Sequence, residues 1–256
     1  MKNTALVLLG RDNSEEFEKM LTRDGVNYIH ECTDGEIREN VTVHSDTETR
    51  ISLETAGISE DACLHLLSTA GGLVRQGDLV AFSGRLPVGV DKRKIVKSLK
   101  SLSGSGAKLF VDTNSFDMDD IRKLRPYLIK PNEFELAEIT GENISSRDDV
   151  LRAGKMLCAA GNCRVLVSLG ERGAMLVTED GAYFARAPKI DAVSTIGAGD
   201  STLAGFISAK AEGRSDSDAL VRSVAWGTAK CTEAGTLPPK KDTARKTESL
   251  IKAENL

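Results

Sequence analysis

The feature that most constrains the fold is an alternation of short apolar runs and helix-like amphipathic segments, which begins at about residue 79. Such a rhythm predicts βαβ units, because neighbouring parallel strands need a long crossover that is usually a helix. The strands are expected at 79–84, 108–114, 127–132 and 164–170, and the helices between them at 91–102, 115–124 and 147–161. We therefore predict an α/β fold, with a doubly wound, mostly parallel sheet and helices on both faces.

The alternation changes near the end of the chain. The segment TEDGA at 178–182 separates two apolar runs and predicts a hairpin. Beyond it, the pattern predicts two long helices at about 200–212 and 216–233 and a last helix at about 242–253.

The first quarter of the chain has a different pattern. The opening MKNTALVLLG is typical of a buried strand, and three further strand candidates follow at 27–33, 36–45 and 49–55. These three have polar turns and no helix between them, so they cannot be parallel neighbours. We expect a small antiparallel β lid at 27–55, attached to a single domain that spans residues 1–256.

Composition excludes several classes of protein. The net charge of −4 argues against nucleic acid as the main partner, which usually needs a basic face. No apolar run has the length of a membrane span, so no membrane partner is expected. The five cysteines form no C-x-x-C pair, which excludes the usual zinc motifs and favours free thiols in a reducing cytoplasm.

Several common catalytic motifs are absent from the sequence. There is no G-x-x-x-x-G-K-[ST] phosphate loop, no G-x-S-x-G elbow and no H-E-x-x-H pair. Thr202 stands where the dinucleotide-binding fingerprint would need its third glycine. The remaining candidate is a site that binds phosphate at helix N-termini.

The stretch VSTIGAGDSTLAGF at 193–206 places two glycines directly before an aspartate and an apolar helix-like run. Glycines let successive N–H groups point one way, and a helix that begins at about Asp200 adds its unpaired N–H groups and its positive dipole end. Gly197, Ala198 and Gly199 could then hold a transferring phosphoryl group while Asp200 orients a hydroxyl. Alternatively, Asp200 is only the N-cap of the helix.

The segment KPNEFEL at 130–136 also allows two interpretations. Asn132 and Glu135 fit a capping box for the helix that follows. They also lie at the carboxyl end of an expected strand, where α/β proteins bind ligands and where a carboxylate can hold Mg²⁺ through water.

Two further segments carry polar groups suited to phosphates. In SLGERG at 168–173, a glycine turn after a strand could admit a nucleotide phosphate or could be a simple hairpin turn. In EIRENVTV, alternation places Arg38 and Asn40 on one strand face, and an arginine fork suits a phosphate. An exposed polar strand face is the alternative.

Taken together, four stretches resemble the ribokinase-like (PfkB-type) carbohydrate kinases: STIGAGDST, SLGERGA, KPNEFEL and SGRLPVGV. The resemblance runs from about Val7 to Thr236, and the G-A-G-D core is its most specific part. It is strongest to the branch that phosphorylates ketohexose phosphates, because Arg38, Asn40 and the segment from Ser83 to Gly89 match that branch.

The resemblance implies an ATP-dependent kinase that uses Mg²⁺ and a sugar phosphate, with fructose 1-phosphate as the first expected substrate and tagatose 6-phosphate as the second. It also allows a homodimer through the β lid. The resemblance implies Asp200 as the base and the backbone of Gly197, Ala198 and Gly199 as the anion hole. The implied ATP residues are Asn132, Ser168, Gly170, Glu171, Arg172, Gly173 and Gly199, with Glu135 for the metal's water shell. The implied substrate residues are Arg38, Asn40, Gly84 and Asp200.

The chain departs from the family pattern in its first part. The family's N-P-x-D sugar contact and G-G-K-G-x-N turn are absent, and Gly71-Gly72 is followed by Leu73. We therefore expect an incomplete sugar side and a chain that is a natural short form or a fragment. A non-catalytic nucleotide-binding remnant is the alternative. A kinase for an unphosphorylated substrate such as a nucleoside is disfavoured, because it would not need Arg38.

Overall fold

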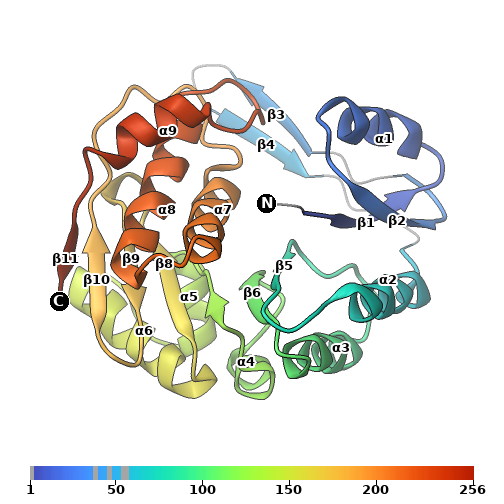
Figure 1. Ribbon diagram of the computed structural model, residues 1–256, viewed down its shortest axis with the longest axis horizontal. Helices are drawn as coiled ribbons and strands as arrows, with labels where there is room; N and C mark the ends of the chain where they lie inside the picture. The colour runs from blue at the N-terminus through green and yellow to red at the C-terminus, as the bar shows by residue number, and fades with distance from the viewer. Residues whose placement is uncertain (1–2, 37–39, 45–47, 53–57) are drawn as a thin grey trace. The chain divides into compact units, whose positions relative to one another are not determined.

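The computed structural model describes residues 3–36, 40–44, 48–52 and 58–256, and the chain forms two compact units (Figure 1). Each unit is described by itself. The first comprises Met1–Gln76 and Leu86–Ser105, and the second comprises Gly77–Arg85 and Gly106–Leu256. No described helix is long and apolar enough to cross a membrane.

The second unit is built on a sheet that has seven strands among its described residues, in the order β11-β10-β9-β8-β7-β6-β5. The strands are β5 (Leu79–Ser83), β6 (Lys108–Asp112), β7 (Leu128–Ile129), β8 (Arg164–Ser168), β9 (Ala174–Val177), β10 (Ala182–Ala185) and β11 (Ala253–Asn255). Strands β5 to β8 are parallel neighbours, and the pairs from β8 to β11 are antiparallel. The carboxyl ends of four parallel strands therefore lie along one edge of the sheet.

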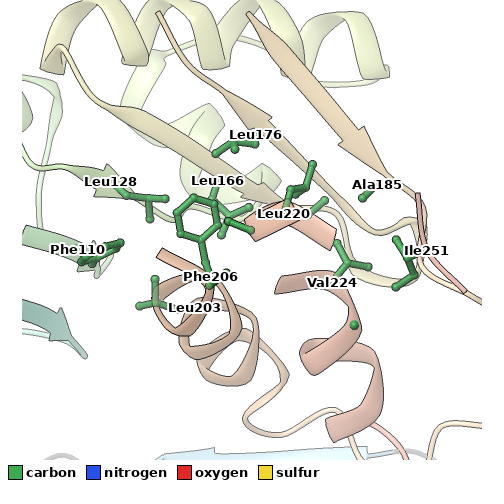
Figure 2. Packing of buried hydrophobic residues seen from close by; sticks show 14 residues of the cluster. Phe110, Leu128, Leu166, Leu176, Ala185, Leu203, Phe206, Leu220, Val224 and Ile251 are labelled. Carbon is green, nitrogen blue, oxygen red and sulfur yellow. The ribbon is translucent and has the colours of Figure 1, made fainter. Parts of the chain in front are cut away.

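Helices cover both faces of this sheet. They are α4 (Met118–Leu124), α5 (Glu133–Thr140), α6 (Arg147–Gly161), α7 (Ala198–Ala211), α8 (Asp216–Lys230) and α9 (Lys241–Glu248). Alternation along β9 separates the faces: Val177 points toward Gly154 of α6, whereas Leu176 joins the cluster formed with α7 and α8. The buried side chains of that cluster lie between the sheet and the two helices (Figure 2).

Glycines allow α7 and α8 to pack with their backbones close together. A Cβ built on Gly205 of α7 would lie 2.9 Å from the backbone oxygen of Arg222 in α8. A Cβ on Gly227 of α8 would lie 2.2 Å from Oγ1 of Thr202 in α7. Since neither position has room for a methyl group, both glycines are required by the helix contact.

The first unit contains a parallel strand pair and a hairpin. Strand β1 (Ala5–Gly10) pairs in parallel with β2 (Tyr28–Thr33), and α1 (Ser14–Arg23) connects them. Strand β3 (Asn40–His44) pairs antiparallel with β4 (Glu48–Ser52). Helices α2 (Glu60–Leu73) and α3 (Lys92–Gly104) complete the unit.

The predicted α/β fold with a largely parallel sheet is confirmed, and the hairpin at 178–182 is present as β9 and β10. Two expectations are wrong. Strand β2 pairs in parallel with β1, so the antiparallel part of 27–55 is the β3–β4 hairpin. The last helix ends at Glu248, and residues Ala253–Asn255 add a strand beside β10. Whether the hairpin acts as a lid stays a prediction.

The close contact of α7 and α8 can be tested with one small substitution. Gly205→Ala should lower the free energy of unfolding by about 1–3 kcal/mol, because a methyl group forces two backbones apart. The matched control is Gly72→Ala in α2, where an added Cβ would have no neighbour within 4 Å. That control should raise stability by about 0.5–1 kcal/mol. Urea unfolding curves that shift in the same direction for both variants would contradict the packing.

Candidate active site

The loop before α7 turns sharply at Gly197, and the helix starts at the next residue, Ala198. Gly197 is the N-cap and has a left-handed φ of 76°. The Ala198 N–H donates to the Thr195 carbonyl at 3.2 Å, and the Ser201 N–H donates to the Gly197 carbonyl at 2.9 Å. The amides of Gly199 and Asp200 fall in the first turn, where an α-helix provides no carbonyl partner. The segment Gly197–Asp200, called the anion loop below, thus presents N–H groups at the positive end of a helix.

Asp200 is exposed in this first turn and is not the N-cap. The helix begins two residues earlier than the sequence pattern indicated, so the capping interpretation of Asp200 is wrong. Gly197 takes the N-cap position with no side-chain hydrogen bond. The carboxylate of Asp200 is therefore not needed to close the helix. A Cβ built on Gly197 would lie 3.9 Å from Oδ2 of Asp200, so the carboxylate lies beside the glycine turn.

A buried ion pair lies next to the anion loop. Nζ of Lys130, just after β7, is 3.0 Å from Oδ1 of Asp112 at the end of β6. The Lys130 side chain is only 6% exposed and that of Asp112 17%. A Cβ built on Gly199 would lie 3.5 Å from Nζ of Lys130. The ammonium group therefore lies against the backbone of the anion loop, at the carboxyl edge of the parallel strands.

Burial and neighbouring charges shift the pKa of Asp112. Burial raises the pKa of Asp112 above its ordinary value, the charge and hydrogen bond of Lys130 oppose this, and the carboxylates of Asp200 and Glu135 raise the pKa further. The carboxylates of Asp200 and Glu135, from two other elements, are thus close enough to Asp112 to act on it electrostatically. Among the described residues, however, no three acidic, histidine or cysteine side chains are close enough to form a complete metal site.

Asn132 and Glu135 form the predicted capping box at the start of α5. Oδ1 of Asn132 accepts from the Glu135 N–H at 2.9 Å, and Oε2 of Glu135 accepts from the Asn132 N–H at 2.9 Å. The capping interpretation is confirmed, and it uses only one oxygen of each side chain. The carboxamide nitrogen of Asn132 and the second oxygen of Glu135 take no part in the box.

The turn after β8 is held against the start of α5. Asn132 and Ser168 form a parallel β-bridge, and Arg172 makes an ion pair with Glu133. The turn contains a 3₁₀ helix, Gly170–Arg172, followed by Gly173 with a φ of 107°. A Cβ on Gly173 would lie 2.0 Å from the Ala185 carbonyl oxygen, so only glycine fits there. Ser168, Gly170, Glu171, Arg172 and Gly173 are therefore brought together beside Asn132.

Apart from Asp200, the predicted substrate residues lie on different parts of the chain. The Gly84 N–H donates to the Asp112 carbonyl at 3.1 Å, which places Gly84 at the same strand edge as the ion pair. Asn40 is exposed at the start of β3 in the first unit, and Arg38 lies outside the described residues. The structure thus places Gly84 at the strand edge that carries the site, whereas the substrate roles of Arg38 and Asn40 stay predictions.

Sequence reasoning missed Asp112 and the contact of Lys130 with Gly199. Both residues stand at the carboxyl end of an expected parallel strand, in KLFVD and YLIK. A search for polar side chains at every strand end would have found them, because neighbouring parallel strands bring their ends together.

The buried pair yields a stability prediction. Asp112→Leu should lower the free energy of unfolding by about 3 kcal/mol, because it leaves the Lys130 ammonium buried without an anion. Adding Lys130→Met should restore most of this loss. Asp119→Leu is the control, since Asp119 pairs with Arg122 at 2.8 Å on the surface. It should cost less than about 1 kcal/mol. Equal losses for Asp112→Leu and Asp119→Leu in urea titrations would refute the assignment of a buried pair.

Comparison with known proteins identifies relatives with sugar-kinase names. The chain is 31% identical to 1-phosphofructokinase of Haemophilus influenzae over 221 residues, which cover 85% of this chain and 70% of the relative. It is 30% identical to 1-phosphofructokinase of Bacillus subtilis, covering 79% of this chain and 67% of that one. Both alignments extend over most of each protein.

A solved structure supports the same grouping. Phosphofructokinase-2 from Escherichia coli in complex with potassium superposes with a TM-score of 0.88 at 25% identity, covering 96% of this chain and 81% of that one. The sequence profile described as pfkB family carbohydrate kinase matches residues 2–243. The chain therefore belongs to the pfkB family of carbohydrate kinases, which transfer a phosphoryl group from ATP.

Proposed function

We propose that this kinase phosphorylates a free hydroxyl of a ketohexose phosphate, with fructose 1-phosphate converted to fructose 1,6-bisphosphate. The names of the two relatives support this substrate. The observation that carries the proposal is the exposed Asp200 in the first turn of α7, beside the anion loop and near the buried Lys130. A carboxylate next to an anion-binding helix terminus is the arrangement that phosphoryl transfer needs.

In this proposal Asp200 accepts the proton of the attacking hydroxyl and orients it toward the phosphoryl group. The backbone of Gly197, Ala198 and Gly199 forms the anion hole. Because the Ala198 N–H already donates to Thr195, the main donors are the amides of Gly199 and Asp200. Lys130 adds positive charge at Gly199, although Asp112 balances part of it. Stabilisation by such fixed groups is strong because they need no reorganisation during the reaction.

The nucleotide is proposed to bind along the strand edge that leads to the anion loop. The turn at Ser168, Gly170, Glu171, Arg172 and Gly173 is the proposed ATP site, and the free carboxamide nitrogen of Asn132 is the proposed donor to its phosphates. The bridge between Asn132 and Ser168 supports a common site for these residues.

Mg²⁺ fits the acidic residues at this edge. Mg²⁺ keeps several waters and is usually bound through one or two carboxylates together with substrate phosphates, so an all-protein cage is not required. Glu135 has one carboxylate oxygen outside the capping box, and its negative charge raises the pKa of Asp112. We propose that Glu135 holds the water shell of Mg²⁺, which when bound neutralises phosphate charge.

The proposed sugar contacts are the residues that the family resemblance implies, and each is considered on its own element. Gly84 would contact the sugar, and Arg38 and Asn40 would contact its phosphate. An arginine fork matches a phosphate in a bidentate manner, which supports a substrate that is already phosphorylated. Tagatose 6-phosphate is the second candidate substrate, because it also carries a phosphate that an arginine can bind.

The role of Asp200 gives the main test of the proposal. Asp200→Asn should lower the kcat for sugar-dependent ADP release by about 10²- to 10⁴-fold, because the amide cannot accept the hydroxyl proton. ATP binding should stay close to that of the wild type, since the backbone of the anion loop is unchanged. Asp180→Asn, in the turn between β9 and β10, is the control and should leave turnover intact. A fully active Asp200→Asn variant would remove Asp200 from the mechanism.

Arg38 tests the class of substrate. Arg38→Met should raise the KM for fructose 1-phosphate by about 10- to 100-fold, because charged hydrogen bonds to the sugar phosphate are lost. The KM for ATP should not change. If the KM for both substrates stayed the same, Arg38 would not contact the sugar phosphate.

A further inference from the structure

The last residue of α8, Lys230, is a buried lysine that the proposed mechanism does not use. It is 1% exposed, although it is a charged residue at the end of a helix. Its Nζ donates to the carbonyl oxygens of Gly235 at 3.0 Å and Glu233 at 3.4 Å. The ammonium therefore lies among backbone oxygens of the turn that follows α8.

Within the part of the chain that the structure describes, the Lys230 ammonium has no carboxylate partner at ion-pair distance. Among the residues that the structure describes, no carboxylate oxygen lies within 4.0 Å of its Nζ; the Glu233 carboxylate instead lies 3.5 Å from Nζ of Lys240. Lys130 differs, because Asp112 supplies its anion. Buried charges are ordinarily paired, and carbonyl dipoles alone leave a net positive charge. Lys230 is thus a buried cation that forms no ion pair with any carboxylate that the structure describes.

This cation lies beside the anion loop. A Cβ built on Gly197 would lie 3.6 Å from Cε of Lys230 and 3.9 Å from Oδ2 of Asp200. The end of the lysine side chain and the Asp200 carboxylate therefore both reach the N-cap glycine. Backbone bonds add to this contact, because the Val193 and Ser194 N–H groups donate to the Cys231 carbonyl at 2.7 and 3.3 Å. The segment that leads into the anion loop is therefore hydrogen-bonded to Cys231, the residue that follows Lys230.

We propose that Lys230 is a built-in cation of the anion loop: its ammonium, held by the Glu233 and Gly235 carbonyls, supplies the positive charge that holds the terminal phosphate of ATP at Gly197–Asp200. The inference rests on the proposed function, because the anion is taken to be a phosphoryl group. The bound phosphate would then add an anion next to a lysine that forms no ion pair among the described residues. Lys230 is a positioning residue in this account, since it acts through the loop.

Charge and packing can be separated by three variants of the full chain. Lys230→Met keeps the length of the side chain and removes the charge, and Lys230→Ala opens a space lined by the two carbonyls. Lys210→Met is the matched control: Lys210 is half-buried, with 12% of its side chain exposed, and it pairs with Asp216 at 3.0 Å at the other end of α7. Urea unfolding shows whether each variant is folded.

Calorimetric titration with ATP gives a readout that does not depend on turnover. Lys230→Met should weaken ATP binding about tenfold or more and should lower kcat about 10²-fold, the effect of removing one preorganised group at an anion hole. Lys210→Met should bind ATP as the wild type does. For Lys230→Ala, 100 mM ammonium chloride should restore affinity at least several-fold over tetramethylammonium chloride at about the same ionic strength, because only the small cation fits among the carbonyls.

The outcomes separate this inference from the kinase proposal. Wild-type ATP affinity in folded Lys230→Met would overturn the role of Lys230 and leave the kinase proposal standing. Weakened binding in Lys230→Ala that ammonium does not restore would also overturn it and assign a packing role. If the wild type releases no ADP with any sugar phosphate, but Lys230→Met still loses affinity and Lys230→Ala is rescued, the kinase proposal fails and the built-in cation stands.

Discussion

The buried pair of Lys130 and Asp112 connects the two parts from which the candidate site is made. Asp112 ends β6, Lys130 follows β7, and the ammonium lies against Gly199 in the first turn of α7. The pair thus links neighbouring parallel strands to a helix that arrives more than 60 residues later in the chain. The carboxylate of Asp112 offsets part of the free-energy cost of burying the Lys130 ammonium. The contact places a positive charge directly against the backbone of the anion loop.

Helix packing sets the direction in which the anion loop points. Gly205 and Gly227 let α7 lie directly against α8, and α8 ends at Lys230 beside the same loop. The N-terminus of α7 and the C-terminus of α8 consequently lie together. The carbonyls after α8 hold the Lys230 ammonium close to the first-turn N–H groups of α7, which favour an anion. The same two glycines that permit close packing therefore also determine the electrostatics of the site.

Much of this arrangement was predictable from local patterns, and the failures have identifiable causes. The strand and helix rhythm after residue 79 and the Gly-Ala-Gly-Asp stretch located the sheet and the loop. Helix α1 was missed because SEEFEKMLTR is mostly polar, and without it β1 and β2 could not be recognised as a parallel pair. Strand β11 depends on pairing with β10, which lies about 70 residues earlier, and no local signal reports such a contact. Burial of Lys230 likewise arises only when α8 meets the loop before α7.

The most direct test of the site is a crystal structure of the chain with Mg²⁺ and a non-hydrolysable ATP analogue. The account predicts that the terminal phosphate lies on the amides of Gly199 and Asp200, near the ammonium groups of Lys130 and Lys230, with the nucleotide reaching the turn at Ser168–Gly173. A triphosphate bound elsewhere, without contact to residues 197–200, would contradict the assignment of the anion loop and of every role built on it.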